Sequence, residues 1–328
     1  MSTSDQAMRR ILVVRLGAMG DVLHALPAVS TLHASFPEAE ITWVVDPKWA
    51  VLLSGNSAVG RVVTFDRRRW GSIVAARAVL RAAEFDAALD FQGLIKSAVL
   101  ARFLARCRVR YGFDRSQVRE KAAAWWYDRT CLARSAHVVE RNIELAMAAG
   151  ATRRCLDTPM PAGRPEGGAL PTEPFVLTSP MAGWTSKQWP LEYFADLARR
   201  IAPVPLVLNG APGAEGELRE IATGEGNVRI HLSGIEGLID ATRRAAAVVG
   251  VDSGPLHLAA ALGKPGVAIF GPTDPARNGP YGGTMTVLRD PRAVTTYKRG
   301  STVSDSMRAV DAGQVATALL GIWQSEAQ

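Results

Sequence analysis

The segment Gly17-Ala-Met-Gly20-Asp21 places a carboxylate directly after a glycine turn, at the end of an apolar run. Such a turn can open a helix whose backbone N–H groups hold an anion, and a carboxylate there can act as a general base. The alternative is that Asp21 only caps the helix. The turn is not a dinucleotide fingerprint, because the leading glycine of G-x-G-x-x-G is missing. It is not a Walker A loop either, because no Gly-Lys-Ser/Thr follows.

A second loop, GWTSKQWP at residues 183–190, also follows an apolar run. Its Thr185, Ser186 and Lys187 bring two hydroxyls and an ammonium into one loop. Lys187 can pair with a phosphate as a point charge while the hydroxyls donate hydrogen bonds beside it. The loop is therefore a candidate phosphate site, and an ordinary surface loop with a lysine is the alternative.

A third motif, Asp252-Ser253-Gly254, ends another apolar run, and Pro255 suits the first turn of a helix that follows. Ser253 is a candidate N-cap of that helix, and the helix start is a candidate anion site. His257 falls in the first turn and is expected to face the same ligand. The alternative for His257 is the structural role that most helix histidines have.

Basic residues gather in DRRRW (66–70) and in the stretch 102–129, where three aromatic residues at 125–127 lie among them. Arginine beside aromatic rings suits an anionic, partly apolar ligand, such as a phosphorylated glycolipid at a membrane surface. RNA and a solvated helix face are the alternatives. Against RNA, the sequence contains no known RNA-binding module.

The motifs lie between short apolar runs and helical patterns that alternate along the chain, which predicts parallel sheets covered by helices on both faces. Strands are expected at residues 11–16, 40–46, 59–66, 85–93, 174–180, 204–210, 228–234, 247–252 and 266–272. Helices are expected at residues 21–36, 71–84, 94–107, 191–202, 216–222, 238–245, 255–263 and 311–325. Between 156 and 173 the alternation stops and Pro and Gly accumulate, which indicates a flexible linker. Because ligands of such sheets bind at the carboxyl ends of the strands, the active site is expected in a cleft between two α/β domains.

The 328 residues predict two domains, and the net charge of +7 indicates an anionic partner. No apolar run reaches the roughly 18 residues of a membrane-spanning helix, and the polar N-terminus predicts no signal peptide. The three cysteines show no C-x-x-C spacing. This argues against a zinc site or a disulfide framework and fits a reducing cytoplasm.

Together these motifs resemble those of glycosyltransferase family 9, the ADP-heptose:lipopolysaccharide heptosyltransferases. The resemblance runs from about residue 10 to the end of the chain. It rests on RLGAMGDVLHALPAV, FDAALDFQGLIKSA, YGFDRSQVREKAAAWWYDR, HVVERN, SKQWP and VDSGPLHLAAALGKP followed by FGPTDP. Residues 110–129 look like the acceptor region of the heptosyltransferase I subgroup. The resemblance implies an α/β fold of the GT-B type, in which two Rossmann-like domains face a central cleft.

The resemblance also implies how the chain is divided. Residues 1–155 are expected to form an N-terminal domain that binds the acceptor, and residues 156–173 the linker. Residues 174–310 are expected to form a C-terminal domain that binds the ADP-sugar. Residues 311–328 are expected to form a C-terminal helix that can pack back on the N-terminal domain.

The implied reaction is inverting transfer of heptose from ADP-L-glycero-D-manno-heptose to the Kdo of lipid A, without a metal ion or cofactor. Asp21 is expected to be the general base, and Lys187 is expected to neutralise the departing ADP. The other residues expected to bind the donor are Thr185, Ser186, Glu215 (or, by a shift of register, Glu217), Asp252, Ser253, Gly254 and His257. The residues expected to bind the acceptor are Gly20, His24, Arg67, Arg68 and Arg119.

The expected partners are an ADP-sugar, the anionic Kdo-lipid A and the inner-leaflet membrane surface, with no nucleic acid. A cytoplasmic protein bound peripherally to the inner membrane is expected. One alternative is another family 9 transferase, similar to heptosyltransferase II or III or with a different acceptor. A nicotinamide-dependent oxidoreductase is disfavoured by the missing glycine. The last alternative is a basic protein that binds RNA or membranes without catalysis.

Overall fold

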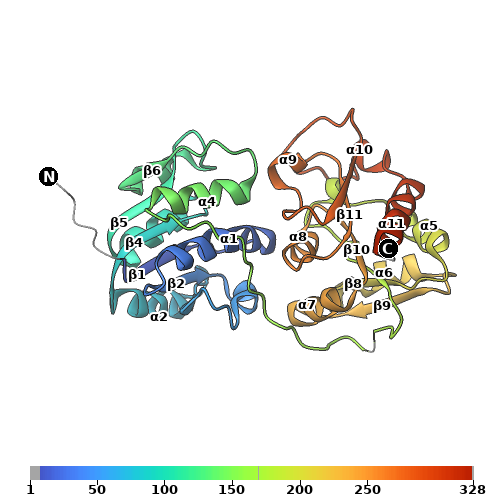
Figure 1. The fold of residues 1–328 in the computed structure, drawn as a ribbon, viewed down its shortest axis with the longest axis horizontal. Coiled ribbons are helices and arrows are strands. Elements are labelled where there is room, and N and C mark those ends of the chain that lie inside the picture. Colours follow the sequence, from blue (N-terminus) through green and yellow to red (C-terminus); the bar gives the residue numbers. More distant parts are fainter. Residues whose placement is uncertain (1–7, 169, 327–328) are drawn as a thin grey trace. The chain divides into compact units, whose positions relative to one another are not determined.

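The computed structural model describes residues 8–168 and 170–326, and the chain forms two compact units that divide between Pro161 and Ala162. Each unit is built around its own six-stranded parallel sheet with helices packed on it (Figure 1). The division falls inside the stretch 156–173 that the sequence marks as a linker. Within the described ranges, no helix is both long enough and apolar enough to cross a bilayer.

The sheet of the first unit has the strand order β3-β2-β1-β4-β5-β6, and each neighbouring pair is parallel. Its strands are β1 (Arg10–Val14), β2 (Glu40–Val45), β3 (Arg61–Thr64), β4 (Glu84–Asp90), β5 (Arg106–Phe113) and β6 (Arg129–Cys131). The chain direction across the sheet reverses between β1 and β4. These two strands therefore form the topological switch point of a doubly wound fold.

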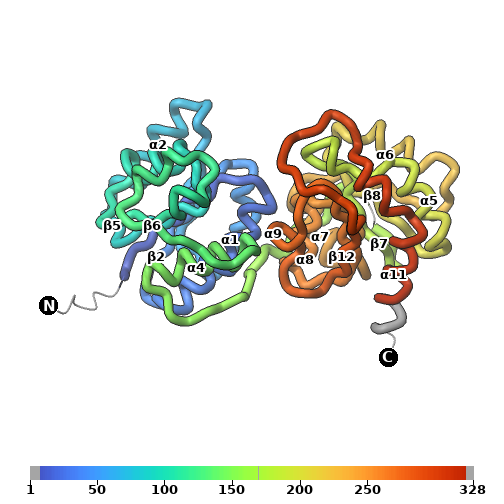
Figure 2. Tube along the Cα trace, turned by 90° about the horizontal axis from the view of Figure 1, so that it is seen from above, coloured from blue at the N-terminus to red at the C-terminus, as the bar shows by residue number. Residues whose placement is uncertain are grey.

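Helices cover both faces of this sheet. Its helices are α1 (Met19–Ser35), α2 (Trp70–Arg81), α3 (Ile95–Val99) and α4 (Val138–Ala148), with the short turns η1 (Pro47–Leu53), η2 (Leu100–Leu104) and η3 (Lys121–Trp126). α1 packs against α4, whereas α2 packs against η2, the wide π turn that continues α3. Leu12 and Val14 of β1 join the core beneath α2 and η2. Because strand side chains alternate between faces, Ile11 and Val13 point to the other face. Figure 2 shows α2 and α4 on opposite sides of the strands.

The second unit repeats the same topology. Its strand order is β12-β11-β10-β7-β8-β9, which again reverses between the first and fourth strands in chain order, β7 and β10. Its strands are β7 (Val176–Thr178), β8 (Leu206–Gly210), β9 (Val228–Leu232), β10 (Ala247–Val251), β11 (Gly266–Phe270) and β12 (Met285–Arg289). Its helices are α5 (Leu191–Ile201), α6 (Glu215–Ala222), α7 (Ile235–Arg244), α8 (Gly254–Ala261), α9 (Pro275–Asn278), α10 (Asp305–Arg308) and α11 (Ala312–Glu326), with the turns η4 (Thr185–Lys187) and η5 (Pro212–Ala214).

The C-terminal helix α11 packs in the second unit. Its Val315, Ala316 and Leu319 belong to the apolar core of that unit, and the helix contacts α5 and β11. These positions recur at helical spacing and so form one stripe. The stripe is buried against α5 and β11 within the second unit, and packing of this helix on the first domain stays a prediction.

The stretch 156–173 makes hydrogen bonds to each of the two units. The backbone oxygen of Asp157 accepts a bond from Ser30 Oγ at 2.6 Å within the first unit. The carboxylate of Glu166 accepts a bond from the Gly234 N–H at 2.8 Å within the second unit. Proline and glycine make this stretch irregular, and these hydrogen bonds tie Asp157 to the first unit and Glu166 to the second.

Three strands and three helices were not expected from the sequence: β5, β6, β12, α4, α9 and α10. The helix expected at 94–107 also ends early. From Arg106 the chain reads RCRVRYGF and pairs in parallel with β4. This strand, β5, lies next to the edge strand β6. Its alternating arginines give it a polar pattern, so a search for apolar periodicity does not detect it.

Candidate functional site

In each unit, polar residues gather where the two central strands end. Of those singled out in the sequence, Asp21 follows β1 in the first unit, whereas Lys187 follows β7 and Asp252 follows β10 in the second. Gln92, which was not singled out, follows β4. Open α/β sheets bind ligands at such switch points. The topology thus brings together, within each unit, groups that are far apart in the chain.

Asp21 lies in the first turn of α1 and is held from two sides. Its Oδ2 accepts a hydrogen bond from the Ala18 N–H at 3.0 Å, and its Oδ1 forms an ion pair with Arg15 Nη2 at 2.6 Å. The Arg15 guanidinium also donates to the backbone oxygen of Phe91 and is almost buried. The Asp21 side chain is 38% exposed. The carboxylate therefore caps the helix and at the same time remains accessible for proton transfer.

The glycine turn before Asp21 is clamped by the side chain of Gln92. Gln92 Oε1 accepts a hydrogen bond from the Leu16 N–H at 2.9 Å, and its Nε2 donates to the Gly17 oxygen at 3.1 Å. One carboxamide thus satisfies a donor and an acceptor of the turn, which would otherwise depend on water. The clamp fixes the direction in which the chain enters α1 and so the position of Asp21.

Asp90, the last residue of β4, supports this clamp. Its carboxylate accepts hydrogen bonds from the Gln92 N–H at 2.8 Å, Ser97 Oγ at 2.8 Å and Tyr127 Oη at 2.7 Å. Burial raises the pKa of Asp90 above its usual value, although these hydrogen bonds oppose the rise. The network ties the loop after β4 to the residue that follows η3.

A cavity of about 210 Å³ lies beside the glycine turn. Its lining residues are Leu16, Gly17, Asp46, Trp49, Phe65, Arg67 and Lys96. Gly17 has a φ of 153°, and a Cβ there would lie 2.6 Å from Trp49 Nε1, so only glycine allows this close approach. Two cations beside aromatic rings make the cavity suitable for an anionic, partly apolar ligand.

Two residues expected to contact the acceptor lie within α1. Gly20 directly precedes Asp21 in the first turn, and His24 lies about one turn later. The His24 side chain is buried, and its ring meets the ring of His137 edge-on with 5.9 Å between centroids. The structure thus places His24 inside the first unit, below the turn that carries Asp21.

The basic stretch 102–129 is partly used inside the first unit. Arg110 is buried and bonds Asp128 through its Nη1 at 3.2 Å. Arg68 and Arg119 are exposed, and neither lines the cavity that Arg67 lines. Of the three arginines expected to meet the acceptor, the structure therefore brings one, Arg67, to the cavity beside the glycine turn.

In the second unit, Lys187 and Asp252 form a buried ion pair. Lys187 Nζ lies 2.5 Å from Asp252 Oδ2, which also accepts a hydrogen bond from Thr273 Oγ1 at 2.6 Å. His257 Nε2 lies 3.4 Å from the other oxygen, Oδ1. Burial opposes ionisation of Asp252, but the hydrogen bond from His257 and the charge of Lys187 outweigh it, so the pKa of Asp252 lies well below its usual value. An ionised carboxylate therefore holds the ammonium in place.

The loop of residues 183–190 concentrates positive charge around one indole ring. Lys187 Nζ lies 4.4 Å from the ring centroid of Trp184, and the Arg299 guanidinium lies 5.3 Å from the same centroid. Both contacts are cation–π interactions. Ser186 is buried next to Lys187, whereas Thr185 is exposed. Lys187 and Arg299 thus give this loop two cations that suit an anionic ligand.

The start of α8 is the other polar feature of this switch point. Ser253 is the N-cap residue and Gly254 the first residue of the helix, as expected from the sequence. The Ser253 side chain makes no capping hydrogen bond, and its buried Oγ has no partner within the described residues. Buried hydroxyls are normally hydrogen-bonded. The unpaired hydroxyl and the N–H groups of the first turn are therefore suited to bind an anion.

Glu215 lies at the start of α6, beyond the carboxyl end of β8. Its carboxylate forms an ion pair with Arg219 Nη2, one turn later, at 2.6 Å. Glu217 lies in the same first turn and is exposed. Neither residue contacts the Lys187–Asp252 pair, so the structure leaves both as candidates for the ribose contact.

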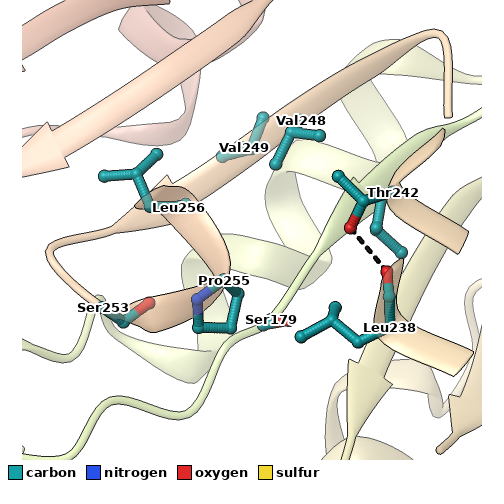
Figure 3. A pocket seen from close by; sticks show the side chains of 10 residues that line it. Ser179, Leu238, Thr242, Val248, Val249, Ser253, Pro255 and Leu256 are labelled. Carbon is teal, nitrogen blue, oxygen red and sulfur yellow. Dashed lines mark hydrogen bonds between the residues drawn. The ribbon is translucent and has the colours of Figure 1, made fainter. Parts of the chain in front are cut away.

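A second and much smaller cavity lies beneath the start of α8 (Figure 3). It measures about 10 Å³ and is lined mainly by apolar side chains of α7, β10 and α8. At its edge Thr242 Oγ1 donates a hydrogen bond to the Leu238 oxygen at 2.6 Å. A space of this size holds at most about one water molecule, so it is a packing gap and not a ligand site.

Sequence reasoning missed Arg15, Gln92, Lys96 and Thr273, each of which contacts or lines one of these sites. All four are polar residues between the carboxyl end of a strand and the first turn of the next helix, a position that points to ligand loops in parallel sheets. In the part of the chain that the structure describes, no three His, Cys, Asp or Glu side chains gather as a metal site requires.

Comparison with known proteins identifies the family. The model of glycosyltransferase family 9 (heptosyltransferase) matches residues 73–304. Lipopolysaccharide heptosyltransferase 1 of Escherichia coli K12 is 34% identical over 301 residues, which cover 86% of this chain and 94% of that protein. Lipopolysaccharide heptosyltransferase 1 of Pseudomonas aeruginosa is 32% identical over 302 residues, which cover 85% of this chain and 83% of that protein.

Solved structures agree with this result. The E. coli heptosyltransferase WaaC with ADP has a TM-score of 0.77 and 29% identity, covering 96% of this chain and 98% of that chain. WaaC with ADP-2-deoxy-2-fluoro heptose has a TM-score of 0.74. E. coli heptosyltransferase II has a TM-score of 0.79 at 22% identity, a likeness that shows the fold alone. The expected GT-B fold with two Rossmann-like units is confirmed.

Proposed function

Because this chain belongs to glycosyltransferase family 9, we propose that it transfers heptose from ADP-L-glycero-D-manno-heptose to the Kdo of lipid A in lipopolysaccharide inner-core synthesis. Inversion at the anomeric carbon, independence from metal ions and the identity of the acceptor are parts of this proposal. The observation that carries it is the accessible Asp21 carboxylate, held by Arg15 at the switch point of the first unit.

Asp21 is the general base in this proposal. Its carboxylate takes the proton of the attacking Kdo hydroxyl while that oxygen bonds to the anomeric carbon and the bond from this carbon to ADP breaks. A single displacement of this kind inverts the configuration. The bonds from Arg15 and the Ala18 N–H hold the carboxylate in one direction, which lowers the entropic cost of reaching the reactive geometry.

Lys187 neutralises the charge that develops on the departing diphosphate. Its ammonium is held in advance by Asp252, and preorganised charges of this kind need no rearrangement during the reaction. The Ser253 hydroxyl and the N–H groups at the start of α8 receive other diphosphate oxygens. The similarity to WaaC structures with ADP and with an ADP-heptose analogue supports an ADP-sugar as the donor.

The acceptor occupies the cavity beside the glycine turn. Arg67 and Lys96 meet its carboxylate and phosphate groups, and Trp49 supplies an apolar wall. A lipid acceptor of this kind lies in a membrane. The proposal therefore includes a cytoplasmic location and a peripheral, salt-sensitive contact with the inner leaflet.

The proposal is tested by ADP release from purified protein mixed with ADP-heptose and Kdo-lipid A. Release that depends on the acceptor supports it. Release with a different lipopolysaccharide acceptor but not with Kdo-lipid A would point to a heptosyltransferase II- or III-like reaction. A protein that binds ADP but releases none with any of these acceptors would contradict the assignment of donor or acceptor.

The Gln92 clamp leads to a prediction about positioning. Gln92→Ala is expected to lower kcat by about 10- to 100-fold, because the turn that aims Asp21 loses two hydrogen bonds and small misplacements are costly. The KM for the ADP-sugar should stay close to that of the wild type, because Gln92 lies in the other unit. Steady-state kinetics with varied donor measures both quantities.

Asn56 provides a matched control for this variant. Its carboxamide likewise accepts a bond from one backbone N–H, that of Ala58, and donates to one backbone oxygen, that of Pro159, in the same unit. Asn56→Ala should therefore cost similar stability and leave kcat nearly unchanged. If both variants lower kcat to the same extent, Gln92 acts only through the stability of the unit.

A further inference from the structure

The outer face of α2 is basic and apolar, and it carries no acid. Residues 67–83 contain five arginines and neither Asp nor Glu. Only Ala76 and Leu80 of α2 are buried, so most of the helix faces solvent. Trp70 is 76% exposed and Val74 is 49% exposed. Large apolar side chains on an open helix, surrounded by one sign of charge, need an explanation beyond the folding of the unit.

The same surface continues onto η2, which packs against α2. Arg81 Nη2 donates a hydrogen bond to the Phe103 oxygen at 3.3 Å, which joins the end of α2 to η2. The Phe103 side chain is itself exposed over about half its area. We call the side chains of Trp70, Val74, Arg77, Arg81 and Phe103 the α2 surface.

We propose that the α2 surface docks the protein on an anionic phospholipid bilayer, with α2 lying in the plane of the interface. Arginines beside Trp and Phe are the composition of interfacial helices, whose apolar side chains enter the headgroup region while the cations stay among the phosphates. A second copy of this chain fits less well, because two such surfaces would repel and neither has an acid to pair with the arginines.

This surface overlaps only partly with the one that the sequence pattern favours. Trp70 is the last residue of the basic stretch 66–70 and Phe103 lies in the stretch 102–129. Within the latter, however, Arg110 is buried against Asp128 and the ring of Trp126 packs edge-on against Phe103. The rest of α2 shows only a helical pattern in the sequence. Its exposure becomes evident once the sheet covers Ala76 and Leu80 and leaves the remaining side chains outside.

The α2 surface lies next to the cavity beside the glycine turn. Arg67, which lines that cavity, comes three residues before Trp70. Docking α2 on a bilayer therefore brings the cavity close to the headgroups, where a lipid-anchored acceptor lies. This link to the acceptor rests on the proposed function, whereas binding of the bilayer does not require transfer to occur.

The test is co-sedimentation of the full chain with vesicles of phosphatidylcholine containing phosphatidylglycerol, at low salt and without substrates. The wild type should bind these vesicles more tightly than vesicles of phosphatidylcholine alone, and added salt should weaken the binding. The double variant Trp70→Ser/Val74→Ser should lower the partition coefficient at least about tenfold, because two apolar side chains lose their burial in the interface. Arg77→Glu should lower it roughly 30-fold, because it reverses one charge near the anionic surface.

Matched controls lie on the opposite side of the same sheet. Met147 on α4 has the same exposed fraction as Val74, 49%, and Arg153 is exposed like Arg77. Met147→Ser and Arg153→Glu should bind vesicles as the wild type does.

The proposal is overturned if the wild type shows no preference for anionic vesicles, or if the α2 variants and the controls bind equally. It is also overturned if the α2 variants change the oligomeric state and not the vesicle binding. None of these results depends on ADP release, so the docking proposal and the transferase proposal can fail separately.

Discussion

Asp21→Asn is expected to lower kcat by about 100- to 10,000-fold, the usual contribution of a positioned general base. Asparagine cannot take the proton of the attacking hydroxyl. Its side-chain oxygen can still accept the bond from the Ala18 N–H, which Asp21 accepts at 3.0 Å, so the cap of α1 is retained. The loss in turnover is measured as ADP release. Thermal unfolding is measured beside it, because the substitution also removes the ion pair between Asp21 and Arg15.

A control variant separates the base from the cap. Glu38→Gln removes an exposed carboxylate just after the same helix and should leave kcat unchanged. A loss of less than about tenfold in Asp21→Asn would mean that Asp21 only caps α1.

Lys187→Met is expected to lower kcat/KM for the ADP-sugar by about 100- to 1,000-fold, comparable to the loss of one preorganised group that stabilises developing charge. The methionine side chain has nearly the same shape but carries no charge. The substitution also leaves the buried Asp252 carboxylate without its ammonium, and breaking a buried ion pair on one side costs about 3–5 kcal/mol of stability. Kinetics and thermal unfolding must therefore be measured together.

A double variant separates these two effects. In Lys187→Met/Asp252→Asn the uncompensated charge is gone, so stability should recover relative to the single variant while turnover stays low. Lys48→Met is a matched control, because Lys48 Nζ lies 4.7 Å from the ring centroid of Trp49, much as Lys187 lies against Trp184. It should leave the KM for the donor unchanged. If activity recovers together with stability in the double variant, Lys187 acts by folding the loop and not on the diphosphate.

The ion pair between Lys187 and Asp252 also determines how the stability of the folded protein is expected to change at acidic pH. The pKa of Asp252 in the folded protein lies below its value in the unfolded chain, so the unfolded chain binds the proton more readily. The stabilising contribution of Asp252 is therefore complete above the unfolded pKa of about 4, and it is lost as the pH falls through the folded pKa.

Two kinds of information were readable from the sequence. The alternation of apolar runs and helical patterns predicts two doubly wound sheets, because a strand buried on both faces must be apolar throughout. In a parallel sheet, all loops that lead from the carboxyl end of a strand to the next helix also lie at the same edge of the sheet. Polar residues in the loops and helix starts that follow a strand, such as Asp21, Lys187 and Asp252, were therefore recognisable as site candidates without knowledge of their neighbours.

The tertiary structure alone decided which groups meet. Lys187 and Asp252 are 65 residues apart, and Gln92 is 75 residues from the Gly17 oxygen that it binds. Periodicity reports whether a side chain is buried but carries no information about its partner across such separations. The same limit explains why Arg110 was counted with a basic surface although it is buried against Asp128. It also explains why the exposed face of α2 beyond Trp70 was not recognised: the sequence determined that a helix forms there, and only its packing on the sheet decided which side chains face outward.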